Sequence, residues 1–139
     1  MTVQDPFGAV LTIIKADPAV AAITTRVSSE VQASPCVQLI VLTETRRPFG
    51  PGSGRMRMNL LMGVARCWAD DSPTGAITAR QLAGAVSDSL HNHRPTTVGT
   101  RYIARAYAPD IEGVTRDPDT RRPFADVSLE VYAAAEAVA

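Results

Sequence analysis

The stretch that decides the fold is RMRMNLLMGVARCWAD, residues 55–70. Apolar side chains occupy every second position over most of its length, at Met56, Met58, Leu60, Met62 and Val64. A period of two is the pattern of a β-strand, because successive side chains point to opposite faces of a sheet. The stretch therefore predicts one long strand. Its methionine face is expected to pack in the core, and the alternative is a contact between subunits.

Further strand patterns lie on both sides of this stretch. Residues 35–43, PCVQLIVLT, are dense in Val, Ile and Leu, which predicts a strand covered on both faces. Residues 100–108 and 124–134 predict two more strands. One face of the last strand carries Ala125, Val127, Leu129, Val131 and Ala133. Residues 116–123, RDPDTRRP, have the composition of a turn, so we expect an antiparallel hairpin there.

Helical segments are predicted from their start signals and their apolar periodicity. Asp5-Pro6 begins an amphipathic helix that ends near Ala16, and Asp17-Pro18 begins a second, short helical turn. Ser72-Pro73 begins a longer helix that ends between residues 91 and 94. Its apolar face carries Ala79, Leu82, Ala83, Val86 and Leu90. This order of elements predicts an α+β fold with helices packed on one face of a mostly antiparallel sheet, as a single domain over residues 1–139.

Composition limits the class of protein. The chain has 139 residues, a formal net charge of zero and 45% hydrophobic residues, which predicts a folded domain and argues against disorder. Cys36 and Cys67 are too few for a disulfide framework, which favours a reducing compartment. The sequence has no basic leader and no apolar run of transmembrane length, so we expect a soluble protein of cytoplasmic origin that does not enter a membrane.

The pentapeptide TRRPF occurs twice, at residues 45–49 and 120–124. The sequences that follow the two copies are unrelated, GPGSGRMRM and ADVSLEVYA, so the copies are not an internal repeat and coincidence is the simplest interpretation. The first copy begins an Arg/Gly/Pro-rich loop, residues 45–54, in which Pro and Gly are expected to exclude regular structure. The second copy places Pro123 at or near the first residue of a strand, where proline is tolerated.

The first copy also belongs to a basic stretch. Residues 45–69 contain five arginines and no acidic residue, at Arg46, Arg47, Arg55, Arg57 and Arg66. Exposed guanidinium groups at the base of the loop suit phosphate or a partner's carboxylates, and Phe49 suits an apolar anchor. The alternative is a solvated loop whose arginines maintain solubility. A complementary acidic patch is predicted from Asp110, Glu112, Asp117 and Asp119.

Patterns that indicate catalysis or cofactor binding are missing from the sequence. The glycines of GPGSG, residues 50–54, precede a strand and lack the Lys-Ser/Thr of a phosphate-binding loop. His91 and His93 are two residues apart, whereas metal ligands on a helix are three or four apart. Asp70, Asp71 and Ser72 are explained by the helix start. We therefore predict no catalytic residue, no metal and no cofactor, and not an enzyme.

Taken together, the elements resemble the tail terminator, or tail completion, proteins of long non-contractile-tailed bacteriophages. The resemblance covers nearly the whole chain and rests on the order of five segments: FGAVLTIIKADPAVAAI (7–23), SPCVQLIVL (34–42), RMNLLMGVARCWAD (57–70), PTGAITARQLAGAVSDSLHN (73–92) and VTRDPDTRRPFADVSLEVYA (114–133). Each segment is weakly specific, and their order and spacing carry the likeness. The loop at residues 45–54 matches no pattern of that family.

The resemblance implies a structural virion protein that is assembled in the host cytoplasm. Its relatives form hexameric rings that cap the tail tube, end tail polymerisation and present a surface for joining the head. The implied partners are further copies of the chain, the tail tube protein, the head-tail connector or neck protein, and genomic DNA in the lumen. Arg46, Arg47, Phe49, Arg55 and Arg57 would then contact a neighbouring ring or that DNA. The alternatives are a neck or head-completion ring subunit and a small nucleic-acid-binding protein.

Overall fold

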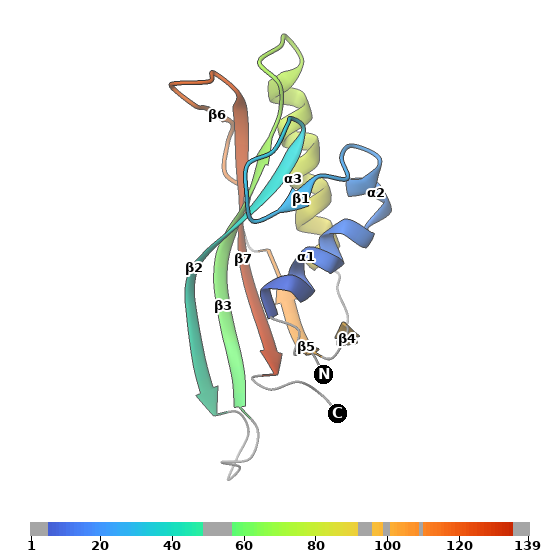
Figure 1. Ribbon diagram of the computed structural model, residues 1–139, viewed down its shortest axis with the longest axis vertical. Coiled ribbons are helices and arrows are strands. Elements are labelled where there is room, and N and C mark those ends of the chain that lie inside the picture. Colours follow the sequence, from blue (N-terminus) through green and yellow to red (C-terminus); the bar gives the residue numbers. More distant parts are fainter. Residues whose placement is uncertain (1–5, 49–56, 92–95, 99–100, 109, 135–139) are drawn as a thin grey trace.

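The structure, a computed structural model, describes residues 6–48, 57–91, 96–98, 101–108 and 110–134. Its elements in chain order are α1 (Pro6–Ala16), α2 (Pro18–Ala21), β1 (Val27–Ser28), β2 (Cys36–Pro48), β3 (Arg57–Trp68), α3 (Gly75–His91), β4 (Thr96–Val98), β5 (Arg101–Tyr107), β6 (Thr115–Arg116) and β7 (Pro123–Ala134). Figure 1 shows a tall sheet with the helices along one side. The predicted α+β class is confirmed, with helices on one face of a mostly antiparallel sheet.

The described strands form one seven-stranded sheet in the order β1-β2-β3-β7-β5-β4. Strand β6 pairs with the first residues of β7, whereas β5 pairs with the last ones. Every pairing is antiparallel except that of β1 with β2. The long strands β2, β3 and β7 form its centre, since β3 pairs with β2 on one edge and with β7 on the other. The antiparallel hairpin predicted around residues 116–123 is present as β6 and β7, in which Arg116 pairs with Pro123.

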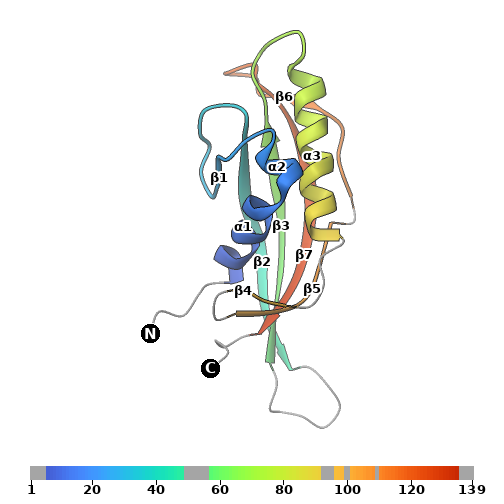
Figure 2. The same cartoon turned by 90° about the vertical axis from the view of Figure 1, so that its right-hand side faces the viewer.

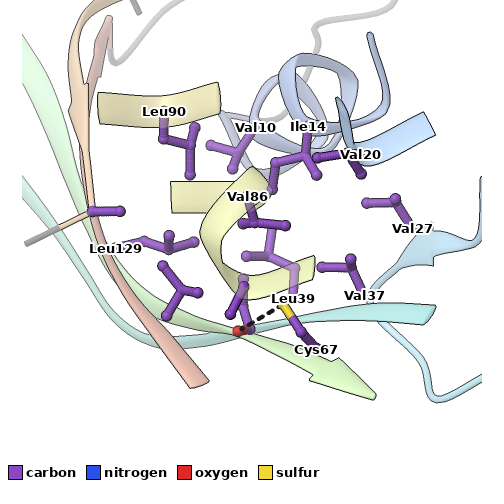
Figure 3. Packing of buried hydrophobic residues seen from close by; sticks show 14 of the residues in the cluster. Val10, Ile14, Val20, Val27, Val37, Leu39, Cys67, Val86, Leu90 and Leu129 are labelled. Atoms are coloured by element: carbon purple, nitrogen blue, oxygen red, sulfur yellow. Dashed lines mark hydrogen bonds between the residues drawn. The ribbon is translucent and has the colours of Figure 1, made fainter. Parts of the chain in front are cut away.

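The helices cover a single face of the sheet, as the side view in Figure 2 shows. All five residues predicted for the apolar face of α3 are buried, and so are the five predicted for one face of β7. They pack together with Val10, Ile14 and Val20 from α1 and α2 (Figure 3). The periods of 3.6 and 2 therefore identified the core-facing side of both elements correctly.

Two predictions about β2 are wrong. The strand continues to Pro48, so residues 45–48 are strand and not part of an irregular loop. They are held by the β3 ladder, in which Thr45 pairs with Leu60 and Pro48 with Arg57. The strand is also not covered on both faces along its length, because Val41, Leu42 and the two residues after them are exposed. Tertiary pairing outweighed the local signal of Pro and Gly.

The methionine face of β3 is not the core face. Leu61, Ala65 and Cys67 are buried under the helices, whereas Met62 is 39% exposed on the opposite face. The expectation that this face packs in the core is wrong at Met62, and the side chains of Met56 and Met58 lie outside the described residues. The buried face of β3 carries Gly63 and Ala65 between Leu61 and Cys67, so its side chains are smaller on average than those of the other face.

The remaining differences concern short elements and boundaries. The strands β1, β4 and the short partner strand β6 were not predicted, since two or three residues carry no periodicity of their own. Helix α3 begins at Gly75, three residues later than Ser72. The short helix α2 begins as predicted, because the Asp17 carboxylate accepts hydrogen bonds from the backbone amides of Ala19 and Val20.

A candidate assembly surface on the β2–β3 ladder

The β2–β3 ladder has two ends with different surroundings. We call Cys36–Leu39 of β2 with residues 65–68 of β3 the packed end, because both faces of the sheet are covered there. We call residues 41–48 of β2 with residues 57–63 of β3 the open end. The two ends share one antiparallel register, apart from a shift between Val41 and Thr43.

The packed end carries an aromatic cluster on the face away from the helices. The rings of Trp68 and Phe124 lie 4.9 Å apart between centroids, and Trp68 is only 5% exposed. The guanidinium of Arg66 lies 4.3 Å from the Phe124 ring centroid, and that of Arg122 lies 4.9 Å from the Trp68 centroid. The indole N–H of Trp68 donates to Gln38 Oε1 at 3.2 Å. These contacts bury a large aromatic surface and satisfy its polar atom.

An ion pair joins β3 to β7 within the same cluster. Arg66 Nε donates to Asp126 Oδ1 at 2.9 Å and Arg66 Nη2 donates to Asp126 Oδ2 at 3.0 Å, a two-pronged geometry. The side chains are 31% and 15% exposed. The Asp126 carboxylate raises the pKa of Arg66 above its ordinary value, first through these hydrogen bonds and then through its charge, while partial burial acts in the opposite direction. The Arg66 guanidinium therefore stays protonated at every ordinary pH.

Arg122, from the second TRRPF copy, ties the segment before β2 to the cluster. Its Nε donates to Ser34 Oγ at 2.6 Å, and its Nη2 donates to the carbonyl oxygen of Gln32 at 2.9 Å. From the other side, Arg26 donates to the carbonyls of Ala33 and Ser34 at 2.7 and 3.1 Å. Two arginines thus hold this segment through its carbonyl and hydroxyl oxygens.

The turn before β7 sets the position of Arg122. The Asp117 carboxylate accepts the backbone amides of Asp119 and Thr120 at 2.8 and 3.0 Å. These bonds lower the pKa of Asp117, with the Thr120 amide as the larger cause. Arg121 adopts a left-handed backbone conformation, φ 62°, which reverses the chain toward Pro123.

The open end exposes apolar side chains close together. Val41 pairs with Gly63 and Thr43 pairs with Met62, so Leu42 is the extra residue of a β-bulge between two adjacent rungs. Val41 is 38% exposed, Leu42 is 67% exposed and Met62 is 39% exposed. We call these three residues the open-end patch. The other large apolar side chains that the described residues expose, Val31, Ile77 and Ile111, lie on three separate elements or connections.

The predicted basic residues fall at the tip of the same ladder. Arg46 pairs with Asn59, Arg47 with Met58, and Arg57 with Pro48, so these three arginines lie on the last rungs of the open end. Phe49 and Arg55 lie outside the described residues. The open-end patch was not predicted as such, although the alternation of β3 had identified Met62 as a possible subunit contact.

The predicted acidic residues lie beside the first half of β7 and in the turn that precedes it. Asp117 is used inside its turn, as described above, and Asp119 is exposed in that turn. Asp110 and Glu112 lie alongside β7, because the Ser128 amide donates to Asp110 O and the Glu112 amide donates to Asp126 O. The turn adjoins the packed end, so it is separated from Arg46 and Arg57 by most of the length of β3 (Figure 1).

Both cysteines of the chain are buried. Cys67 is buried under the helices, and this desolvation raises the pKa of its thiol far above the ordinary range. Cys36 is also buried, near the Arg122 guanidinium on the other face. Within the described residues, no three His, Cys, Asp or Glu side chains are grouped so that they could hold a metal ion. No helix in this part of the chain has the length and apolarity to cross a membrane.

Comparison with known proteins gives a likeness of fold. A chain in the solved structure "Virion of native gene transfer agent (GTA) particle" superposes with a TM-score of 0.66 and 17% sequence identity. The match covers 93% of this chain and 94% of that chain, so it extends over the whole fold and is not confined to a shared motif. No family model and no curated protein matches the sequence.

Proposed function

We propose that this chain is a structural subunit of a phage-like particle, which caps the tail tube as a ring of identical copies. In this role it ends tail polymerisation and offers the surface to which the head is joined. The observation that carries the proposal is the end-to-end likeness of fold to a chain of a gene transfer agent virion. The order of sequence segments, which resembles tail terminators, points in the same direction independently.

The surfaces of the chain support an assembly role. A subunit that acts through contacts needs apolar surface that its own fold leaves uncovered. The open-end patch supplies such surface, with Leu42 exposed by 67%. Arg46, Arg47 and Arg57 lie on later rungs of the same end of the ladder, so this end combines apolar and basic residues, a composition that suits a contact with a charged rim.

Removal of the gene from a particle-producing host tests the role directly. Electron microscopy of the resulting particles is expected to reveal over-long or headless tails, because no ring stops the polymerisation of the tube. Tails of normal length beside unjoined heads would instead indicate a neck or head-completion subunit. Purified wild-type particles that lack this chain would contradict both roles.

The contribution of the open-end patch is tested by complementation with point variants. Leu42→Asp places a charge in the patch, whereas Ile77→Asp places the same charge on α3, where Ile77 is 53% exposed. We expect Leu42→Asp to reduce the yield of complete particles by roughly tenfold or more, the equivalent of about 1.4 kcal/mol in one contact. Ile77→Asp is expected to remain near the wild-type yield. Equal yields for the two variants would remove the patch from the proposal.

A further inference from the structure

Among the described residues, β1 is the only strand on the outer edge of β2, and it pairs only with Val37 and Gln38. In the described part of the chain, no strand continues this pairing from Leu39 to Thr43. The lower part of β2 accordingly forms the border of the sheet on the left of Figure 1. A long exposed edge is a template for another strand, and folded proteins usually shorten or cover it. Here the opposite border is short, since β4 has three residues.

The direction of the edge amides follows from one hydrogen bond. The Val37 amide donates to the carbonyl of Arg26 at 2.9 Å, on the side of β1. Backbone groups point alternately to the two edges of a strand, so the amides of Leu39 and Val41 also point outward. The amides of Gln38 and Ile40 point inward, to the β3 ladder. Val41 thus combines an outward amide with an exposed apolar side chain at the open-end patch.

We propose that this edge of β2 pairs with the β4–β5 border of a second copy of the chain, so that neighbouring sheets join head to tail. The inference rests on the proposed ring function and adds the mode of contact. A ring needs two different surfaces on each copy, and the two borders of one open sheet are such a pair. Strand addition would supply main-chain hydrogen bonds, and Val41 and Leu42 would add apolar contact beside them.

Proline at Val41 separates this contact from the internal fold. Val41→Pro removes one outward amide and leaves the inward amide of Ile40 in place, at an edge position beside a bulge where proline is tolerated. Val41→Ala is the matched control, because it removes the same exposed methyl groups and keeps the amide. Unfolding by denaturant establishes that both variants remain folded before they are compared.

Sedimentation velocity of the purified full chain over a range of concentrations measures the association. We expect wild type and Val41→Ala to associate as the concentration rises. Val41→Pro is expected to associate with a dissociation constant at least about tenfold higher. Association of Val41→Pro equal to that of Val41→Ala would overturn the strand pairing. A chain that stays monomeric throughout the range would overturn self-pairing. In either case, particles that contain the chain and have tails of normal length would leave the proposed function intact.

Hydrogen exchange on the associated species identifies the edge. The amides of Leu39 and Val41 are expected to exchange at least about tenfold more slowly in the assembly than in dilute monomer. Unchanged exchange at both amides, together with association, would assign the contact to another surface and contradict the proposal. Protection of these amides only after another particle protein is added would give the edge a different occupant and contradict pairing with a second copy.

Discussion

The two ends of the β2–β3 ladder have the same strand register and opposite environments. At the packed end, the helices cover one face and the Trp68–Phe124 cluster covers the other, so both strands are enclosed. At the open end, the same strands expose Val41, Leu42 and Met62, and in the described part of the chain no strand pairs with β2 from Leu39 to Thr43. The comparison teaches that the packed end stabilises the fold, which lets the open end carry surface that a partner can use.

The largest effect on stability is expected when the packed end loses the indole ring of Trp68. Trp68→Ala removes the contact with Phe124, the guanidinium contacts of Arg66 and Arg122, and the bond to Gln38. We expect the free energy of unfolding to fall by about 4 kcal/mol, as is typical of a buried aromatic residue. Denaturant unfolding followed by circular dichroism measures this loss. Met62→Ala at the open end is the matched comparison, with an expected loss of about 1 kcal/mol or less; equal losses would abolish the distinction between the two ends.

The backbone of the open end is tight although Val41, Leu42 and Met62 are exposed there. A Cβ on Gly63 would overlap the carbonyl oxygen of Ile40 in the neighbouring strand, and both partners are backbone atoms that cannot rotate away. Gly63→Ala is therefore expected to destabilise the chain by about 2 kcal/mol through forced displacement of β2.

The same substitution in α3 should have the opposite sign. A Cβ on Gly84 meets no atom within 4 Å, and Gly84 lies inside the helix. Gly84→Ala is expected to raise the free energy of unfolding by about 0.5–1 kcal/mol, because alanine has the higher helix propensity. Thermal unfolding of both variants measures the contrast. A stable Gly63→Ala protein would indicate that the ladder at the open end can shift freely.

The ion pairs Arg66–Asp126 and Arg116–Asp71 should contribute differently to the free energy of unfolding, because the first is more buried than the second. Asp126→Asn removes the charge that accepts both Arg66 bonds in a partly buried site, with an expected loss of about 1 kcal/mol. Asp71→Asn acts on the 3.0 Å pair with Arg116, whose side chains are 50% and 43% exposed. We expect a loss there of less than about 0.5 kcal/mol. Chemical denaturation at two salt concentrations tests the pair of variants, and a larger loss at Asp71 would contradict the ranking.

The same comparison explains what the sequence could predict. Alternation and helical periodicity predicted the long strands and the buried faces of α3 and β7, because each of these elements has one clearly apolar side. Strand β3 is apolar on both sides, so the pattern could not decide between Leu61 and Met62 as core residues. That choice depends on which side of β3 the helices cover, and this tertiary contact is not encoded in the alternation of the strand.

The proposed assembly surface was predicted less completely for a related physical reason. The sequence drew attention to the first TRRPF copy, whose arginines do lie at the tip of the open end. The second copy has the better-defined structural role, since Arg122 packs on Trp68 and bonds to the segment before β2. Contacts between residues so far apart in sequence depend on strand register, which local composition does not encode. The free edge of β2 likewise appears only when the partners of every strand are known.

The smallest effect is expected in the turn that positions Arg122, and it depends on pH. Asp117 has a lowered pKa in the folded chain because its carboxylate accepts the amides of Thr120 and Asp119. The Asp117 charge therefore contributes stability at pH values above the pKa that Asp117 has in the unfolded chain, about 3.9. That contribution is lost as the pH falls through the lower pKa that Asp117 has in the folded chain. Asp117→Asn keeps an oxygen acceptor without the charge, so it should be slightly less stable than wild type at neutral pH and approach it in acid. Unfolding measured from pH 7 downward tests this, with Asp119→Asn as the control for net charge in the same turn. A stability difference that stays constant with pH would mean that the geometry of the turn, and not the charge of Asp117, holds Arg122 against the packed end.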